Sequence, residues 1–260
     1  MNRRGIGPPE RTFRRNLAIR QRQQEWMDDP HLDAGLHESA LAGLRRIHWF
    51  SGTAGALWRG MRDVAGATGS ARSAVRILDL ASGGGDLSIA TAERFRSRGV
   101  SAVVHGCDIS GTAVSRARQL ADSRGLTGVE FFQLDVLEDA WPEPDYDIVM
   151  NSLFLHHLSE ESALRLLVRM RESAGLVLVD DLLRTWSGYW LACLGCRLLS
   201  GSPVVHFDGP VSVEAAFSQL EVLELAKRAG LQGANLQRHW PERFLLTWQA
   251  ADVSHSGQRR

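Results

Sequence analysis

Apolar residues recur with two different periodicities along the chain, and the periodicity changes near residue 70. Residues 34–49 place their apolar side chains at close to helical spacing, and a second short helix is expected over 54–64. Gly66 and Gly69 then predict a linker. The first part of the chain, residues 25–70, is therefore expected to be helical.

From residue 74 onward, strand patterns alternate with helix patterns. Strands are expected at 75–80, 102–107, 129–134, 146–150 and 176–179, helices at 86–98, 112–123, 160–173 and 220–229, and a closing hairpin at 234–239 and 243–248. Near-continuous apolar strands are typical of a sheet that is covered on both faces. Since parallel strands need crossover helices, residues 71–250 are predicted to form one α/β, doubly wound domain.

A glycine-rich turn follows the first of these strands, in the segment Ile-Leu-Asp-Leu-Ala-Ser-Gly-Gly-Gly-Asp-Leu at residues 77–87. Glycines at 83, 84 and 85 allow backbone amides to approach a ligand closely. The helix that follows directs its amide end toward the same place. A dinucleotide is one possible ligand, but Ser88 stands where that motif has its third glycine, so this signal is weak.

Three acids, one at each of the first three strands, favour a different ligand. Asp79 lies within the first strand, where it would repel a pyrophosphate and attract an ammonium group. Asp108 could accept hydrogen bonds from ribose hydroxyls, and Asp135 from an adenine amino group. S-adenosylmethionine carries all of these groups and no phosphate. The sequence therefore predicts S-adenosylmethionine as cofactor and S-adenosylhomocysteine as product.

With these motifs the chain resembles the class I S-adenosylmethionine-dependent methyltransferases from about residue 74 to 248, through ILDLASGGGDL, CDIS, QLDV and DIVMNSLFLHHL. The resemblance implies a Rossmann-like seven-stranded sheet of order 3-2-1-4-5-7-6 with strand 7 antiparallel. It also implies cofactor contacts from Asp79, Ala81, Ser82, Gly83, Gly85, Asp108, Ile109, Asp135, Val136, Asn151 and Ser152. One position departs from the family pattern, since Ala81 stands where a glycine is usual.

Two adjacent histidines, His156 and His157, follow the fourth strand at the carboxyl edge where such sheets bind ligands. Histidine is the usual base for removing the proton of a phenol or enol near neutral pH. Neighbouring helical residues point about 100° apart, so only one of the two is expected to face the cleft. The alternative is that a given histidine caps the helix or packs in the core.

Aromatic residues and an acid are candidates for contact with the methyl acceptor. Asp181 ends the fifth strand, where it could orient a substrate hydroxyl or simply begin the next helix. Trp186 and Trp190 lie in an insertion at 184–217, and Trp49 lies in the N-terminal helical part. Together these are expected to form a lid over an aromatic or lipid-like acceptor. Ordinary packing of a helical annex is the alternative.

Charge is balanced overall, with 30 basic and 30 acidic residues, but residues 1–24 hold seven arginines and one acid. We expect flexible tails at 1–24 and 251–260. The favoured function is methylation of oxygen or carbon on a small aromatic, quinone-like or polyketide acceptor of secondary metabolism, without a nucleic-acid partner. An RNA methyltransferase that uses the arginine-rich segment and a non-catalytic cofactor-binding scaffold remain alternatives.

Three cysteines are too few for a disulfide framework and no secretory signal is evident, which predicts a cytoplasmic protein. The longest apolar run, 186–199, is shorter than the roughly twenty residues of a membrane span. Cys193 and Cys196 lack a second ligand pair for zinc, so no metal site is predicted from the sequence. The oligomeric state is left open.

Overall fold

The protein is described here by a computed structural model. It describes residues 16–28, 32–33, 35–36, 39–40, 43, 46–47, 51–67, 74–143 and 145–250. Trp49, most of the helix expected at 34–49, and the terminal segments 1–15 and 251–260 lie outside the described residues.

Seven strands form one sheet in the order β3-β2-β1-β4-β5-β7-β6. The strands are β1 (Val75–Leu80), β2 (Ala102–Asp108), β3 (Val129–Gln133), β4 (Tyr146–Ser152), β5 (Ala174–Leu182), β6 (Asn235–His239) and β7 (Arg243–Gln249). The first five are parallel, and β7 runs antiparallel to both β5 and β6. The predicted α/β class, strand order and antiparallel seventh strand are confirmed.

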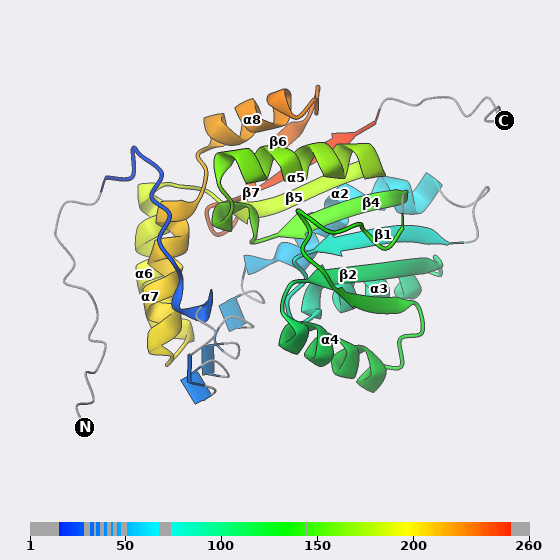
Figure 1. Ribbon diagram of the computed structural model, residues 1–260, viewed down its shortest axis with the longest axis horizontal. Helices are drawn as coiled ribbons and strands as arrows, with labels where there is room; N and C mark the ends of the chain where they lie inside the picture. The colour runs from blue at the N-terminus through cyan, green and yellow to red at the C-terminus, as the bar shows by residue number, and fades with distance from the viewer. Residues whose placement is uncertain are drawn as a thin grey trace.

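Alternate side chains of the central strands enter two separate cores. In β1, Ile77 packs on one face of the sheet and Leu78 on the other. The first face is covered by α2 (Thr53–Ala67), α3 (Asp86–Ser97) and α4 (Gly111–Ser123), and the second by α5 (Glu160–Ser173) and α8 (Gln219–Arg228) (Figure 1). Helices on both faces explain why these strands read as nearly continuous apolar runs.

Helix α2 belongs to the sheet core and does not cover the ligand cleft. Leu57, Trp58 and Met61 are all buried, and the Trp58 ring meets Phe95 of α3 edge-on at 5.2 Å. Their spacing gives the helix one apolar face, which the sheet buries. The part of the expected N-terminal lid that falls at 53–67 is therefore structural.

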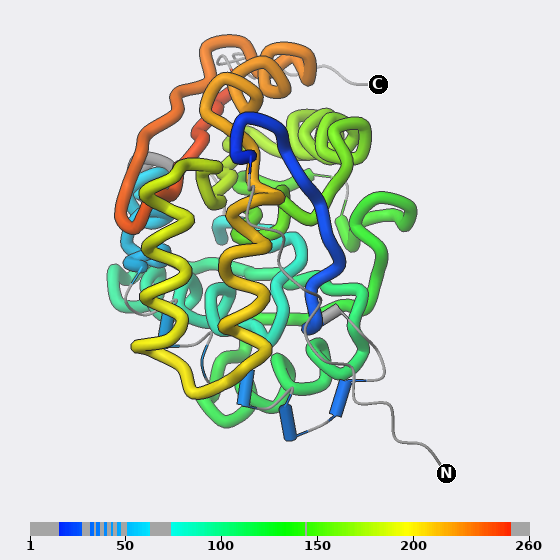
Figure 2. The backbone as a smooth tube through the Cα atoms, turned by 90° about the vertical axis from the view of Figure 1, so that its left-hand side faces the viewer, coloured from blue at the N-terminus to red at the C-terminus, as the bar shows by residue number. Residues whose placement is uncertain are grey.

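Two further helices, α6 (Trp186–Leu199) and α7 (Pro203–Ala215), stand beyond the carboxyl edge of the parallel strands (Figure 1). Residues 16–28, which we call the N-terminal strap and which include the short helix η1 (Trp26–Asp28), run alongside α7 (Figure 2). In the strap, Gln21 N donates to Glu214 O at 3.0 Å, and the Trp26 ring stacks on Phe207 at 4.7 Å. Residues 16–24, expected within a flexible tail, are thus packed against the domain. Among the described helices, none combines the length and apolarity that crossing a bilayer requires.

Candidate active site

The turn after β1 is shaped by three residues with positive φ: Ala81 at 54°, Gly83 at 54° and Gly85 at 78°. A Cβ at Gly85 would lie 2.6 Å from the Phe131 ring, so this position requires glycine. Ala81 adopts the left-handed conformation that a glycine adopts with less strain. Helix α3 begins directly after Gly85, and its free amide groups face the turn.

Asp108 at the end of β2 is fixed beside this turn. Its Oδ2 accepts a hydrogen bond from Gly83 N at 2.8 Å, and its Oδ1 accepts one from Ser110 N at 2.9 Å. Gly83, Gly84 and Asp108 line the same cavity. The acid and the turn, predicted separately from the sequence, therefore meet in one site.

Asp79 lies beneath the turn and is 1% exposed. Ser88 Oγ donates a hydrogen bond to its Oδ2 at 2.6 Å. Burial raises the pKa of Asp79 to about 7, the Ser88 hydrogen bond opposes this rise, and the nearby Asp108 charge adds to it. The carboxyl group of Asp79 is therefore buried under the turn and held there by the hydrogen bond from Ser88.

Two buried oxygens near the turn, Ser82 Oγ and Asn151 Oδ1, have no hydrogen-bond partner among the described residues. The other end of the Asn151 amide donates to Leu80 O at 2.9 Å, which fixes the orientation of the side chain. Buried polar atoms of this kind normally have a partner. Orphan acceptors, free amides and the Asp108 carboxylate form a donor and acceptor set that fits the ammonium, carboxylate and hydroxyl groups of S-adenosylmethionine.

The remaining residues of the predicted cofactor site lie around this centre. Ile109 is 68% exposed at the end of β2, and Ser152 Oγ donates to Asp180 Oδ1 at 3.3 Å. Asp135 Oδ1 accepts from Leu137 N at 2.8 Å, next to the buried Val136. The described residues that line the cavity include Asp108 but neither Asp135 nor Val136.

The other end of the cavity centres on His156 in the short helix η2 (Leu155–His157). The His156 ring is 4% exposed, and its Nδ1 lies 2.7 Å from Asp181 Oδ1. The backbone N of His156 donates to Asp181 Oδ2 at 3.0 Å, so Asp181 orients both the backbone and the ring. Burial disfavours the charged form of Asp181, but the contact with His156 and a hydrogen bond from Leu182 N hold its pKa below the ordinary value.

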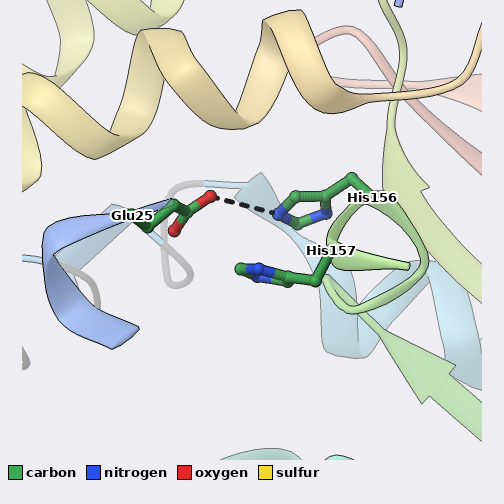
Figure 3. Close-up of side chains that lie close together, drawn as sticks. All are labelled: Glu25, His156 and His157. Carbon is green, nitrogen blue, oxygen red and sulfur yellow. Dashed lines mark ion pairs between the residues drawn. The ribbon is translucent and has the colours of Figure 1, made fainter. Parts of the chain in front are cut away.

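His157 also lines the cavity, although only one of the two histidines was expected to do so. The two rings lie 4.2 Å apart and are tilted by 34°. Helix η2 is a single short turn at the edge of the sheet, so both side chains can reach the same space. Glu25 of the N-terminal strap faces them, with its Oε1 at 3.7 Å from His156 Nε2 (Figure 3).

One cavity of about 570 Å³ joins these two ends. Its apolar wall comes largely from α6 and α7, through Leu191, Ala192, Cys196, Leu199, Val205 and Val213. Polar groups are few there, which is typical of pockets that bind small organic molecules. The space therefore runs from the glycine turn, past the histidines, to an apolar chamber.

Comparison with known proteins agrees with this geometry. Residues 77–174 match a family model described as a methyltransferase domain. The segment is a class I S-adenosylmethionine-dependent methyltransferase domain. Over 111 residues the chain is 32% identical to the ubiquinone/menaquinone biosynthesis C-methyltransferase UbiE of Xanthomonas campestris pv. campestris. That match spans 42% of this chain and 43% of the relative, so it covers less than half of either protein.

Solved structures share the fold of this methyltransferase domain. Magnesium protoporphyrin IX methyltransferase from Synechocystis, solved with S-adenosylhomocysteine, has a TM-score of 0.55 and 17% identity, over 86% of this chain and 90% of its own. An O-methyltransferase family 2 protein from Planctomyces limnophilus, in complex with apigenin, has the same score and identity, over 86% of this chain and 63% of its own. The predicted family and cofactor class are confirmed.

The aromatic residues predicted to contact the acceptor are placed differently. Trp186 and Trp190 of α6 are 54% and 65% exposed, whereas Leu191 and Gly195 of the same helix line the cavity. Residues four apart share one face of a helix, so both tryptophans point outward together. Trp186 and Trp190 therefore do not line the cavity, so their contact with the acceptor stays a prediction, and Trp49 lies outside the described residues.

Several residues that line the cavity were missed by sequence reasoning. Glu25 is the first residue of the part expected to be helical, 25–70, and no motif marked it; Asp208 lies in a helix that carried no motif. Arg243 is 2% exposed and donates to Thr53 Oγ1 at 2.8 Å, besides pairing with Asp180. A charged residue opening the apolar run of β7 was the one available signal for Arg243.

Proposed function

We propose that this protein transfers a methyl group from S-adenosylmethionine to oxygen or carbon of a small, largely apolar acceptor of aromatic, quinone-like or polyketide type. The observation that carries this proposal is the single cavity that joins Gly83 and Asp108 to the buried His156. The names of similar proteins, a ubiquinone/menaquinone biosynthesis C-methyltransferase and an O-methyltransferase family 2 protein in complex with apigenin, support this class of acceptor.

In this proposal the turn holds the cofactor. When bound, S-adenosylmethionine supplies an electrophilic methyl group on a sulfonium. Ala81, Ser82, Gly83 and Gly85 would surround its methionine end, with Asp79 beneath as a negative charge and Asn151 and Ser152 toward the methyl group. Asp108 would accept from the ribose hydroxyls, Ile109 would cover the adenine, and Asp135 and Val136 would bound its far side.

His156 would act as the base at the acceptor end. Its Nδ1 is held by Asp181 at 2.7 Å, which leaves the Nε2 lone pair for the cavity. The acceptor O–H bond would break as its proton passes to Nε2, while the oxygen forms a bond to the methyl carbon and the carbon–sulfur bond breaks. The sulfonium charge is lost as the thioether forms, and the proton stays on the imidazole. His157 would pack against this ring and against the acceptor.

The strap supports a small acceptor rather than RNA. Arg20 Nη2 donates to His156 O and to Leu158 O at 2.8 Å each, and Arg22 Nη2 donates to His157 O at 2.6 Å. These two arginines of the basic segment are thus engaged with the protein's own backbone. Phosphate binding would have to displace them.

The test is methyl transfer by the purified full chain from isotopically labelled S-adenosylmethionine to a panel of phenols, quinols and enolic polyketides. We expect S-adenosylhomocysteine and a labelled product with at least one acceptor of this panel, and no label in RNA. Binding of S-adenosylhomocysteine measured by calorimetry is the control for an intact cofactor site. Labelled RNA, or a cofactor-binding protein that methylates nothing in the panel, would contradict the proposed function.

A further inference from the structure

We propose that Glu25, His156 and His157 form a binding site for a divalent transition-metal ion of the zinc type. One oxygen of Glu25 and one ring nitrogen of each histidine lie within 4.8 Å of one another. Figure 3 shows the carboxylate and the two rings directed toward a common space. Two imidazoles and one carboxylate form a ligand set that zinc uses where its fourth position stays open to a ligand.

The geometry of His156 supports this assignment. Because Asp181 occupies Nδ1, the free nitrogen is Nε2, and it lies 3.7 Å from Glu25 Oε1. Two ligand atoms of a tetrahedral ion with bonds of about 2.0–2.1 Å lie roughly 3.4 Å apart. A small rotation of either side chain would therefore bring both atoms to the coordination distance.

Two of the three proposed ligands, His156 and Glu25, are each held in place by a hydrogen bond with a further side chain. Asp181 and His156 form the carboxylate–histidine pair that commonly orients a metal-binding imidazole and strengthens it as a ligand. Ser212 Oγ donates to Glu25 Oε1 at 2.5 Å. Such support is expected of a preorganised metal site, and it reduces the side-chain entropy that is lost when an ion binds.

The N-terminal strap keeps Glu25 in position opposite the histidines. Directly after Glu25, Trp26 N and Met27 N donate to the Asp208 carboxylate at 2.8 and 3.1 Å. The side chains of His156 and Glu25 are only 4% and 11% exposed. An ion bound here would be shielded from solvent and would link the strap to η2, with its open position toward the cavity.

An ion at this site would also affect the proposed reaction, a consequence that rests on the proposed function. The metal would use the lone pair on His156 Nε2, which the base needs for the acceptor proton. Metal binding and proton abstraction would exclude each other, so the ion would inhibit turnover. Without an ion, Glu25 and His156 would simply form an acid–base contact.

The binding test uses the tag-free full chain after treatment with a chelator. We expect it to bind one Co²⁺ with the visible absorption of a tetrahedral complex, and one Zn²⁺ by equilibrium dialysis. Asp181→Asn, which removes the supporting carboxylate, should weaken binding about 10–100-fold. Glu25→Gln and His157→Ala should each weaken it by at least as much, while the matched control His206→Ala, outside the cavity, should not.

Calorimetry with S-adenosylhomocysteine verifies that each variant is folded, since the cofactor end is not altered. If the wild-type chain binds neither ion, or if Glu25→Gln and His157→Ala both bind as tightly as the wild type, the metal site is refuted. Turnover with an active acceptor then separates the two proposals. Inhibition by Zn²⁺ at the concentration that fills the site supports both, whereas a filled site with full turnover refutes His156 as the base and leaves the metal site standing.

Discussion

The two ends of the cavity are built from the chain in different ways. The cofactor end comes mostly from one stretch of the chain, residues 79–110, where β1, its turn, α3 and β2 follow one another, and Asn151 joins it from β4. The acceptor end combines the N-terminal strap with η2, β5, α6 and α7, which are far apart in the sequence. Local geometry determines the first end, and tertiary packing determines the second. Changes at the cofactor end should therefore alter cofactor affinity, and changes at the acceptor end should alter turnover and acceptor choice.

The largest expected effect is that of His156→Gln on turnover. If His156 is the base, kcat should fall about 10²–10⁴-fold, because that is the usual contribution of a positioned proton acceptor. The affinity for S-adenosylhomocysteine should stay within about twofold, since the ring lies away from the glycine turn. Steady-state kinetics and calorimetry measure the two quantities, and His206→Gln is the control for a histidine outside the cavity.

A phenol of low pKa sharpens this prediction, because an acceptor that is already ionised needs no base. The loss of kcat in His156→Gln should be much smaller with such an acceptor than with a weakly acidic one. Equal loss with both acceptors would show that the ring positions the acceptor and does not remove its proton.

The next largest effect is expected at the other end of the cavity. Asp108→Ala removes the carboxylate that Gly83 N and Ser110 N contact, and with it the proposed ribose contact. Charge-assisted hydrogen bonds contribute about 1.5–3 kcal/mol each, so cofactor affinity should fall about 100-fold. Asp122→Ala, an exposed acid on α4, is the matched control for calorimetry. Cofactor binding at wild-type affinity in Asp108→Ala would show that Asp108 only shapes the loop.

The sequence predicted the cofactor end well because its signals are local. The strand bounds, the glycine turn and Asp108 depend on residues within one β-α-β unit. At the acceptor end, His156 could be placed from the strand before it. Glu25 could not be placed in this way, because its position depends on contacts with Asp208 and Ser212 of α7. The local sequence around Glu25 does not predict these long-range contacts.

Asp79 gives a smaller effect that depends on pH. Its pKa in the folded chain, about 7, lies above the unfolded value of about 3.9. Its contribution to stability is then fully present below about pH 4 and is lost as the pH rises through 7. The shift corresponds to at most about 4 kcal/mol, and an amide buried in its place would itself cost about 1–3 kcal/mol.

Asp79→Asn should therefore raise the free energy of unfolding by about 1–3 kcal/mol above pH 7 and reduce its decline between pH 4 and 7. Urea unfolding at several pH values measures both quantities in the cofactor-free chain. Asp122→Asn, which changes an exposed acid, should leave the pH dependence as it is in the wild type. An unchanged slope in Asp79→Asn would show that Asp79 is ionised in the folded protein at neutral pH.

The smallest effect is expected from Trp190→Ala, and it tests which face of α6 belongs to the acceptor end. Trp190 is 65% exposed, so its removal should change the acceptor KM by less than about twofold. The neighbouring Leu191→Ala removes part of the cavity wall and should raise KM several-fold for an apolar acceptor, because each buried methylene contributes about 0.8 kcal/mol. Steady-state kinetics compares the acceptor KM of the two variants directly, since their substitutions lie at adjacent positions of the helix. If Trp190→Ala were the more damaging change, α6 would have to rotate by about 100° when the acceptor binds, and the tryptophans would form the lid that their sequence spacing first indicated.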